Sequence, residues 1–220
     1  MASSNLAAKV GTYVVGADLP VQGIMILGNN FDNRNGYERA MKRGTELADP
    51  VTNPTWKNLL SLLQQVKISI EECFFTNAFM GITDSKSNLG VHEGHSDPPF
   101  CSGCRKIFLH SLELQRPRLL ITLGLPALKF VVSLSGEHDA VQWARSWSSI
   151  DASPRKEIRI PEYSKPVAIA PLVHPSYRDL NVKRRKCGKF EGEKAERVML
   201  IEAIERTHVP FQPESKQRAQ

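Results

Sequence analysis

Two amides and one imidazole stand at the ends of apolar runs in this chain, at Asn30, Asn77 and His174. An amide carries both donor and acceptor groups, which suit it to read the edge of a ring, and an imidazole exchanges protons near neutral pH. In open α/β sheets, ligands bind beyond the carboxyl ends of the strands, where such residues would share one rim. Any one of the three is also explained as a loop residue without a function, but that explanation is much weaker for all three together. The pattern therefore predicts one polar site built from three distant segments.

The elements that must position these residues are short apolar runs without polar alternation, typical of strands buried on both faces of a sheet. The runs cover residues 24–27, 73–77, 119–123 and 167–173. Segments expected to form helices separate them or close the chain, most by their apolar spacing and the first of them as a charged segment after a turn. These segments lie near residues 38–43, 54–63, 104–116, 127–134 and 191–206. Strands that alternate with helices predict an α/β fold, a three-layer α/β/α sandwich with a central, mostly parallel sheet of about four strands.

The chain has 220 residues, an ordinary apolar content of 41% and a formal net charge of +6. We therefore expect a single domain over residues 1–220, with an N-terminal arm at 1–20, a flexible tail at 207–220 and a polyanionic partner. The first residues lack the pattern of a secretory signal. The longest apolar region, 119–132, is interrupted and too short to span a bilayer. We expect a cytoplasmic monomer that does not contact a membrane.

Four segments, in this order along the chain, resemble motifs of the uracil-DNA glycosylase superfamily. Gly28-Asn29-Asn30 is similar to the family's first motif, and Phe75-Thr76-Asn77 is similar to its base-reading strand. Residues 112–124 are similar to its third strand, and His174-Pro175-Ser176 is similar to its last motif. The resemblance covers roughly residues 20–205. It is closest to the bacterial branch that carries an iron–sulfur cluster. It implies an enzyme that flips a nucleotide out of DNA and hydrolyses the bond between base and sugar.

The resemblance also implies catalytic roles. The transition state of base excision places positive charge on the sugar and negative charge on the departing base, so a donor to the base lowers the barrier. By resemblance, His174 is that donor, as a neutral imidazole. Asn30 positions the attacking water, and the nearby Asp32 orients that water or stabilises the sugar cation. Because the motifs place no Lys to form a Schiff base, we expect a monofunctional glycosylase that leaves an abasic site.

By the same resemblance, Asn77 recognises the base. We expect Asn29 to lie beside it at the rim and to contact the base as well. One orientation of the Asn77 amide pairs with uracil and the flipped one with cytosine, so Asn77 alone does not fix the base. Phe31 and Tyr37 are the candidates for stacking under the base, unless they are core residues. The family's first motif continues with Pro and then Gly or Tyr, where this chain has Phe31-Asp32. We therefore expect a modified or bulky pyrimidine as substrate, such as hypermodified cytosine in phage DNA, which would imply antiviral defence.

A basic run follows the last motif, where the family places a loop against DNA. Lys and Arg there would neutralise phosphates, Ser176 would hold a phosphate, and Tyr177 or Arg178 would wedge into the gap left by the flipped base. The expected DNA-binding residues are Ser176, Tyr177, Arg178, Lys183, Arg184 and Arg185. The alternative for the run is a solvated charged loop.

The cysteines and histidines allow a structural metal. Cys104 falls where the iron–sulfur branch has a cluster ligand, but its expected partner after Asn77 is missing and residues 1–20 contain no cysteine, so we expect no cluster. His92 and His95 with Cys101 and Cys104 form two chelating pairs that predict a structural zinc, the alternative being plain loop residues. The chemistry itself requires no cofactor.

Two other functions stay open from the sequence. The altered first motif is compatible with a catalytically inactive, glycosylase-like protein that only binds DNA. An unrelated nucleoside or small-ligand hydrolase of the α/β class is the second alternative.

Overall fold

The computed structural model describes residues 19–31, 33–43, 53–84 and 92–207. The predicted catalytic residue Asp32 lies outside these ranges. So do nearly all of the predicted arm at 1–20 and of the predicted tail at 207–220.

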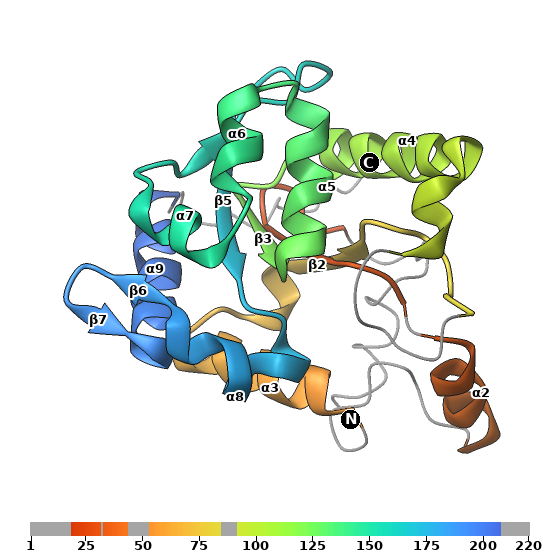
Figure 1. The fold of residues 1–220 in the computed structure, drawn as a ribbon, viewed down its shortest axis with the longest axis horizontal. Helices are drawn as coiled ribbons and strands as arrows, with labels where there is room; N and C mark the ends of the chain where they lie inside the picture. Colours follow the sequence, from red (N-terminus) through yellow and green to blue (C-terminus); the bar gives the residue numbers. More distant parts are fainter. Residues whose placement is uncertain (1–18, 32, 44–52, 85–91, 208–220) are drawn as a thin grey trace, which may run out of the picture.

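A mostly parallel sheet of five strands forms the centre of the molecule, in the order β2-β1-β3-β5-β4 (Figure 1). The strands are β1 (Ile24–Gly28), β2 (Cys73–Asn77), β3 (Leu119–Leu123), β4 (Glu157–Ile158) and β5 (Val167–Leu172). β1, β2, β3 and β5 run parallel, whereas β4 pairs antiparallel with β5. The α/β fold predicted from the sequence is therefore confirmed. The fifth strand was not predicted because its two residues lie in a polar segment and carry no periodic signal.

Helices cover both faces of the sheet, which gives the predicted three layers (Figure 1). One face is covered by α3 (Pro54–Gln65) and α9 (Gly192–Arg206). The other face is covered by α4 (Pro98–Gln115), α5 (Leu125–Ser135), α6 (His138–Trp143) and α7 (Trp147–Ala152). Within β1, Ile24 and Ile26 pack toward the first face and Met25 and Leu27 toward the second. A strand buried on both sides in this way needs an unbroken apolar run, which is the pattern in the sequence.

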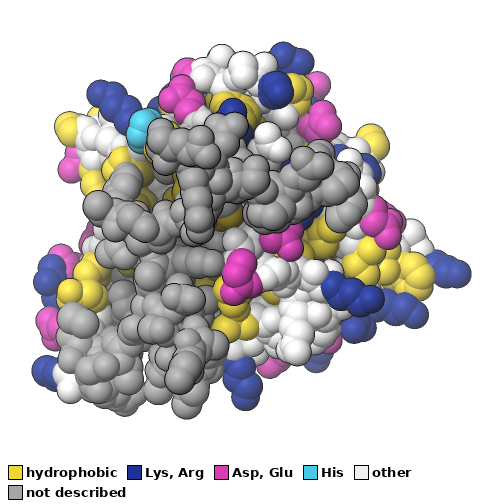
Figure 2. Space-filling view, turned by 180° about the vertical axis from the view of Figure 1, so that it is seen from behind, with side chains coloured by type: hydrophobic (Ala, Val, Ile, Leu, Met, Phe, Trp, Pro, Cys, Tyr) yellow, Lys and Arg dark blue, Asp and Glu magenta, His cyan; other side chains and the backbone are white. Residues whose placement is uncertain are grey.

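Short elements complete the described fold. They are α2 (Arg34–Arg43), α8 (Arg178–Asn181), the 3₁₀ helices η1 (Ile70–Glu72), η2 (Glu93–Ser96), η3 (Pro175–Tyr177) and η4 (Val182–Arg184), and the hairpin of β6 (Lys186–Cys187) and β7 (Phe190–Glu191). The basic run is thus partly ordered as 3₁₀ helix and hairpin. Figure 2 shows Lys and Arg side chains gathered at the edge where this hairpin projects. In the ranges that the structure describes, no helix is both long and apolar enough to cross a bilayer.

Candidate active site

The ends of four parallel strands bring the predicted residues to one edge of the sheet. Gly28 is paired with Asn77 across β1 and β2, and the strands β3 and β5 continue the same edge with Leu123 opposite Leu172. Asn30 is half-buried in the loop after β1, and His174 lies two residues beyond the end of β5. The prediction that these segments meet at one rim agrees with this topology. The individual roles of the residues stay predictions.

Asn77 lies directly over Gly28. A Cβ atom at Gly28 would come within 2.4 Å of Asn77 Oδ1, so any side chain at position 28 would displace the amide. Beyond the strand ends the two loops stay joined, because the Ala78 N–H donates to Gly28 O and the Phe79 N–H to Asn29 O, both at 2.9 Å. The first motif and the base-reading strand therefore form one continuous surface.

Asn29 contributes an unsatisfied acceptor at this rim. Its side chain is buried, and its Oδ1 has no hydrogen-bond partner in the described structure. Buried polar atoms are nearly always paired in folded proteins, so such an exception calls for a donor from water or a ligand. This fits the predicted base-binding role of Asn29.

His174 is held as a neutral imidazole. Its Nδ1 accepts a hydrogen bond from the Ser176 N–H at 3.3 Å, which leaves the proton of the neutral ring on Nε2. Burial lowers the pKa of His174 below the ordinary value of 6.5, because desolvation disfavours the imidazolium. Both features favour a neutral ring with its proton on Nε2, while the role of His174 as a donor to the base stays a prediction.

The start of α5 lies against His174. Gly124, the N-cap of α5, has a φ of +88°, and a Cβ atom there would lie 3.3 Å from His174 Cβ. Glycine at this position permits both the positive φ and the close approach. The positive end of a helix dipole favours negative charge nearby and disfavours an imidazolium. The same position would stabilise an anion that forms next to His174.

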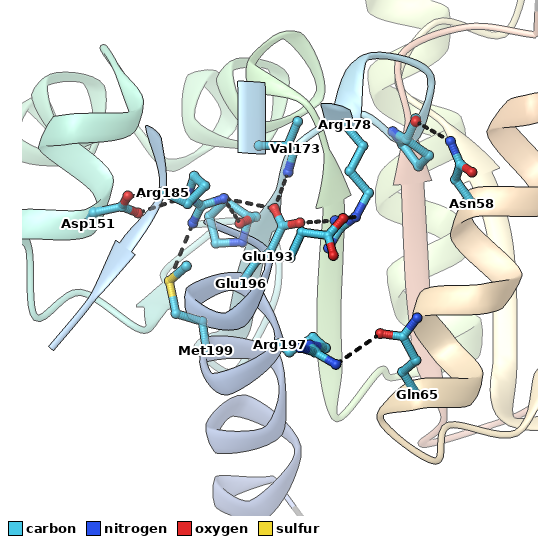
Figure 3. Close-up of polar contacts among 12 residues, drawn as sticks. Asn58, Gln65, Asp151, Val173, Arg178, Arg185, Glu193, Glu196, Arg197 and Met199 are labelled. Carbon is cyan, nitrogen blue, oxygen red and sulfur yellow. Dashed lines mark hydrogen bonds and ion pairs between the residues drawn. The ribbon is translucent and has the colours of Figure 1, made fainter. Parts of the chain in front are cut away.

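The amino-terminal half of α3 supports the loop that carries His174. Asn58 Nδ2 donates to Pro175 O at 3.0 Å (Figure 3), and the hydroxyls of Thr55 and Ser176 share a hydrogen bond. Asn53 caps the same helix, its Oδ1 accepting from the Thr55 N–H at 3.0 Å. The sequence indicated where this helix begins but not which loop it would meet, so Thr55 and Asn58 were missed. The phosphate contact of Ser176 stays a prediction.

Two arginines predicted to bind DNA are buried instead. Arg185 is fully buried and Arg178 nearly so, and both are paired with the buried carboxylate of Glu196. A guanidinium enclosed by protein carboxylates cannot reach a phosphate, so the prediction was wrong for Arg185 and Arg178. The wedge role suggested for Arg178 fails for the same reason.

DNA binding by the exposed part of the basic run stays a prediction. Lys183 and Arg184 are exposed, and the side chain of Tyr177 lies outside the described structure. Leu180 on α8 is 74% exposed, the highest value among the exposed large apolar residues that the structure describes. Sequence reasoning missed Leu180, although an apolar residue inside a basic segment is a recognisable signal.

The two candidate stacking residues, Phe31 and Tyr37, differ in burial and in their position in the fold. Phe31 is partly buried in the loop after β1, next to the rim. Tyr37 is exposed on α2, which Figure 1 places away from α8 and the loop that carries His174. Phe31 is thus the better placed of the two.

The histidine pair predicted to bind zinc lies in an aromatic stack. The His92 ring packs against both Phe79 and Phe100, with centroid separations of 5.3 and 5.4 Å and nearly parallel planes, and the centroids of Phe79 and Phe100 are themselves 6.4 Å apart. Its Nδ1 accepts from the Gly94 N–H at 3.0 Å. His95 meets the Phe79 ring edge-on. These rings therefore pack against aromatic side chains, while the buried His92 Nε2 has no hydrogen-bond partner among the described residues.

The cysteine pair makes hydrogen bonds to the backbone. Cys101 Sγ donates to Gly94 O at 3.2 Å and lies 3.4 Å from His95 O, and Cys104 Sγ accepts from the Met80 N–H at 3.4 Å. Among the described residues, no group of three or more His, Cys, Asp or Glu side chains is arranged to hold a metal ion. The two pairs thus do not converge as one ligand set. Zinc binding itself stays a prediction for metal analysis of the purified protein.

Comparisons with known proteins agree with the motifs. The family model described as Uracil DNA glycosylase superfamily matches residues 23–196, from the start of β1 into α9. A search of curated proteins finds no match to the chain.

Proposed function

The chain belongs to the Uracil DNA glycosylase superfamily, and on that basis we propose that it is a monofunctional DNA glycosylase for a modified or bulky pyrimidine. Membership supports a glycosylase-type activity on DNA. The observation that carries the proposal for this chain is the partly buried His174, whose Nδ1 accepts from the Ser176 N–H beside the start of α5, at the same sheet edge as Asn77. That arrangement suits a reaction in which negative charge develops on a departing base.

The proposed reaction is hydrolysis of the bond between base and sugar. The Nε2–H of His174 donates to the base as the bond breaks, and the positive end of α5 acts on the same charge. The base leaves as an anion, and water, positioned by Asn30, adds to the sugar cation. The proton that this water loses passes through solvent to the released base anion, so the products are the free base and an abasic site. Asn77 holds the edge of the flipped base, and its place over Gly28 limits its movement.

The proposal of a modified pyrimidine rests on the first motif. Phe31 stands where the family has a proline, so the pocket wall differs. The free acceptor of Asn29 suits a donor on the base, either N3–H of uracil or the 4-amino group of cytosine. Hypermodified cytosine of phage DNA fits both features, and antiviral defence is the biological role we propose.

A product-mass assay on duplexes with a panel of bases tests this function. We expect release of a modified cytosine as free base, with an abasic site and no strand cleavage. Release of uracil alone would rule out the proposed substrate class. DNA binding without release of any base would favour an inactive DNA-binding protein, and a preference for free nucleosides would favour a nucleoside hydrolase.

We propose that Leu180 is the wedge that fills the gap left by the flipped nucleotide. It is 74% exposed on α8, directly after the loop that carries His174. Apolar side chains inserted between base steps stabilise an unstacked duplex. Leu180→Ala should lower kcat/KM on duplex DNA about tenfold, equivalent to losing about 1.4 kcal/mol, with a much smaller effect on single-stranded DNA.

Leu114→Ala is the matched control for the wedge. Leu114 is 51% exposed on α4, which Figure 1 places far from α8. It should leave both activities unchanged. Equal losses on single-stranded and duplex DNA for Leu180→Ala would contradict the wedge role.

A further inference from the structure

The carboxylate of Glu196 is fully buried on α9 and is bound on both oxygens (Figure 3). Its Oε1 accepts from the Val173 N–H at 2.6 Å and from Arg185 Nη1 at 3.1 Å. Its Oε2 accepts from Arg178 Nη1. Charge-assisted hydrogen bonds of this kind are stronger than neutral ones, so Glu196 is a firm anchor for what it holds.

The two partners Val173 and Arg178 are the two ends of the loop that carries His174. Val173 precedes His174 and lies just beyond the end of β5, so its N–H is satisfied by the carboxylate of Glu196. Arg178 begins α8, after η3. One buried carboxylate on α9 therefore fixes the loop at its entry and at its exit, while Asn58 holds it from the α3 side.

Arg185 connects this anchor to a second carboxylate farther from His174. Its Nε donates to Asp151 Oδ1 at 3.0 Å, and its guanidinium lies 4.4 Å from the centroid of the Trp147 ring. Asp151 also accepts from the Lys186 N–H at 2.7 Å. Asp151 and Glu196 thus share Arg185, but in Figure 3 Asp151 lies on the opposite side of it from Val173 and Arg178.

We propose that Glu196 is a positioning residue that sets the place of His174 against the departing base. The inference rests on the proposed function, in which His174 donates to that base. Misplacement of a catalytic group by about 1 Å can cost on the order of 10²-fold in rate, so an anchor one residue away matters. Glu196→Gln keeps the shape of the side chain and an acceptor for the Val173 N–H. It removes the charge that holds Arg178 and turns the amide N–H₂ toward the guanidinium group of Arg178.

The experiment compares Glu196→Gln with Asp151→Asn, which damages the same network away from His174. Thermal unfolding, DNA affinity and single-turnover rate are measured at a temperature where both variants are folded. We expect both to lose stability, but Glu196→Gln to lower the rate tenfold or more with little change in DNA affinity, and Asp151→Asn to leave the rate nearly unchanged. Rate losses that follow the loss of stability equally in both variants would overturn the proposal.

A readout independent of activity separates this inference from the proposed function. The ring ¹H–¹⁵N signals of His174, assigned by their loss in His174→Gln, should shift in Glu196→Gln and stay in place in Asp151→Asn. Unmoved signals in Glu196→Gln would overturn the positioning role even in an active enzyme. If the wild-type protein is inactive, the proposed function is wrong, but the comparison of the His174 ring signals still tests whether Glu196 sets the position of His174. If Glu196→Gln does not fold, Arg178→Lys loosens the exit of the loop and is tested in the same way.

Discussion

Replacement of His174 by alanine is expected to lower the single-turnover rate on the best DNA substrate by about 10²-fold to 10³-fold, the usual cost of removing one preorganised donor. The effect should be large because, in the proposed mechanism, the Nε2–H donates to charge that exists only in the transition state. DNA affinity should change little, since His174 itself makes none of the predicted phosphate contacts. Rate and affinity are measured separately on the same duplex.

Two further variants serve as controls for this prediction. His138→Ala removes a histidine that is 83% exposed on α6 and should be neutral. His174→Gln keeps an N–H donor and should recover part of the lost rate. A rate for His174→Ala close to wild type would assign the chemistry to another residue and would remove the main support for the proposed mechanism.

The pH dependence should show the lowered pKa of His174. Because its folded pKa lies below 6.5, the folded protein binds fewer protons than the unfolded chain in the interval between the two pKa values. Stability should therefore fall as pH drops through 6.5 and level off below the folded pKa. The reaction rate should hold through pH 6.5 and decline only at lower pH, where the imidazolium forms. A rate that already declines above pH 6.5 in wild type, and not in His174→Gln, would contradict this.

The predicted strands were accurate because they are buried on both faces. Runs such as residues 73–77 and 119–123 show no regular alternation of apolar and polar residues and contain no charged residue, and the structure has strands with these bounds. The residues that follow such strands could therefore be placed at one rim. By contrast, β4 and the hairpin have strands of two residues, and α6 and α7 have six residues each, which is too short for a hydrophobic period.

Burial of a charged residue was the feature that the sequence could not reveal. Arg185 stands in a run of Lys and Arg that looks uniformly solvated. Its burial depends on Glu196 and Asp151, which come from other elements and meet it only in the folded chain. Long-range pairing of this kind leaves no local pattern, and the same holds for Asn58 against the His174 loop.

Arg185→Ala is expected to destabilise the fold by about 3–5 kcal/mol, because it leaves the buried carboxylates of Glu196 and Asp151 without their shared cation. Loss of the packing of the guanidinium on Trp147 adds to this cost. The free energy of unfolding is measured by urea denaturation, with the slope checked for a change in the unfolded state.

The neighbouring residue supplies the matched control, since Arg184 differs from Arg185 mainly in exposure. Arg184→Ala should change stability by less than about 0.5 kcal/mol. It should weaken DNA binding and reduce the dependence of log K on log salt by about one unit, as expected for one lost phosphate contact. The two adjacent arginines would then have different roles, Arg185 in the stability of the fold and Arg184 in DNA binding. A large loss of DNA affinity in Arg185→Ala with unchanged stability would place its guanidinium at the DNA after all. In that case the buried network around Glu196 would be wrong, and with it the anchor of His174.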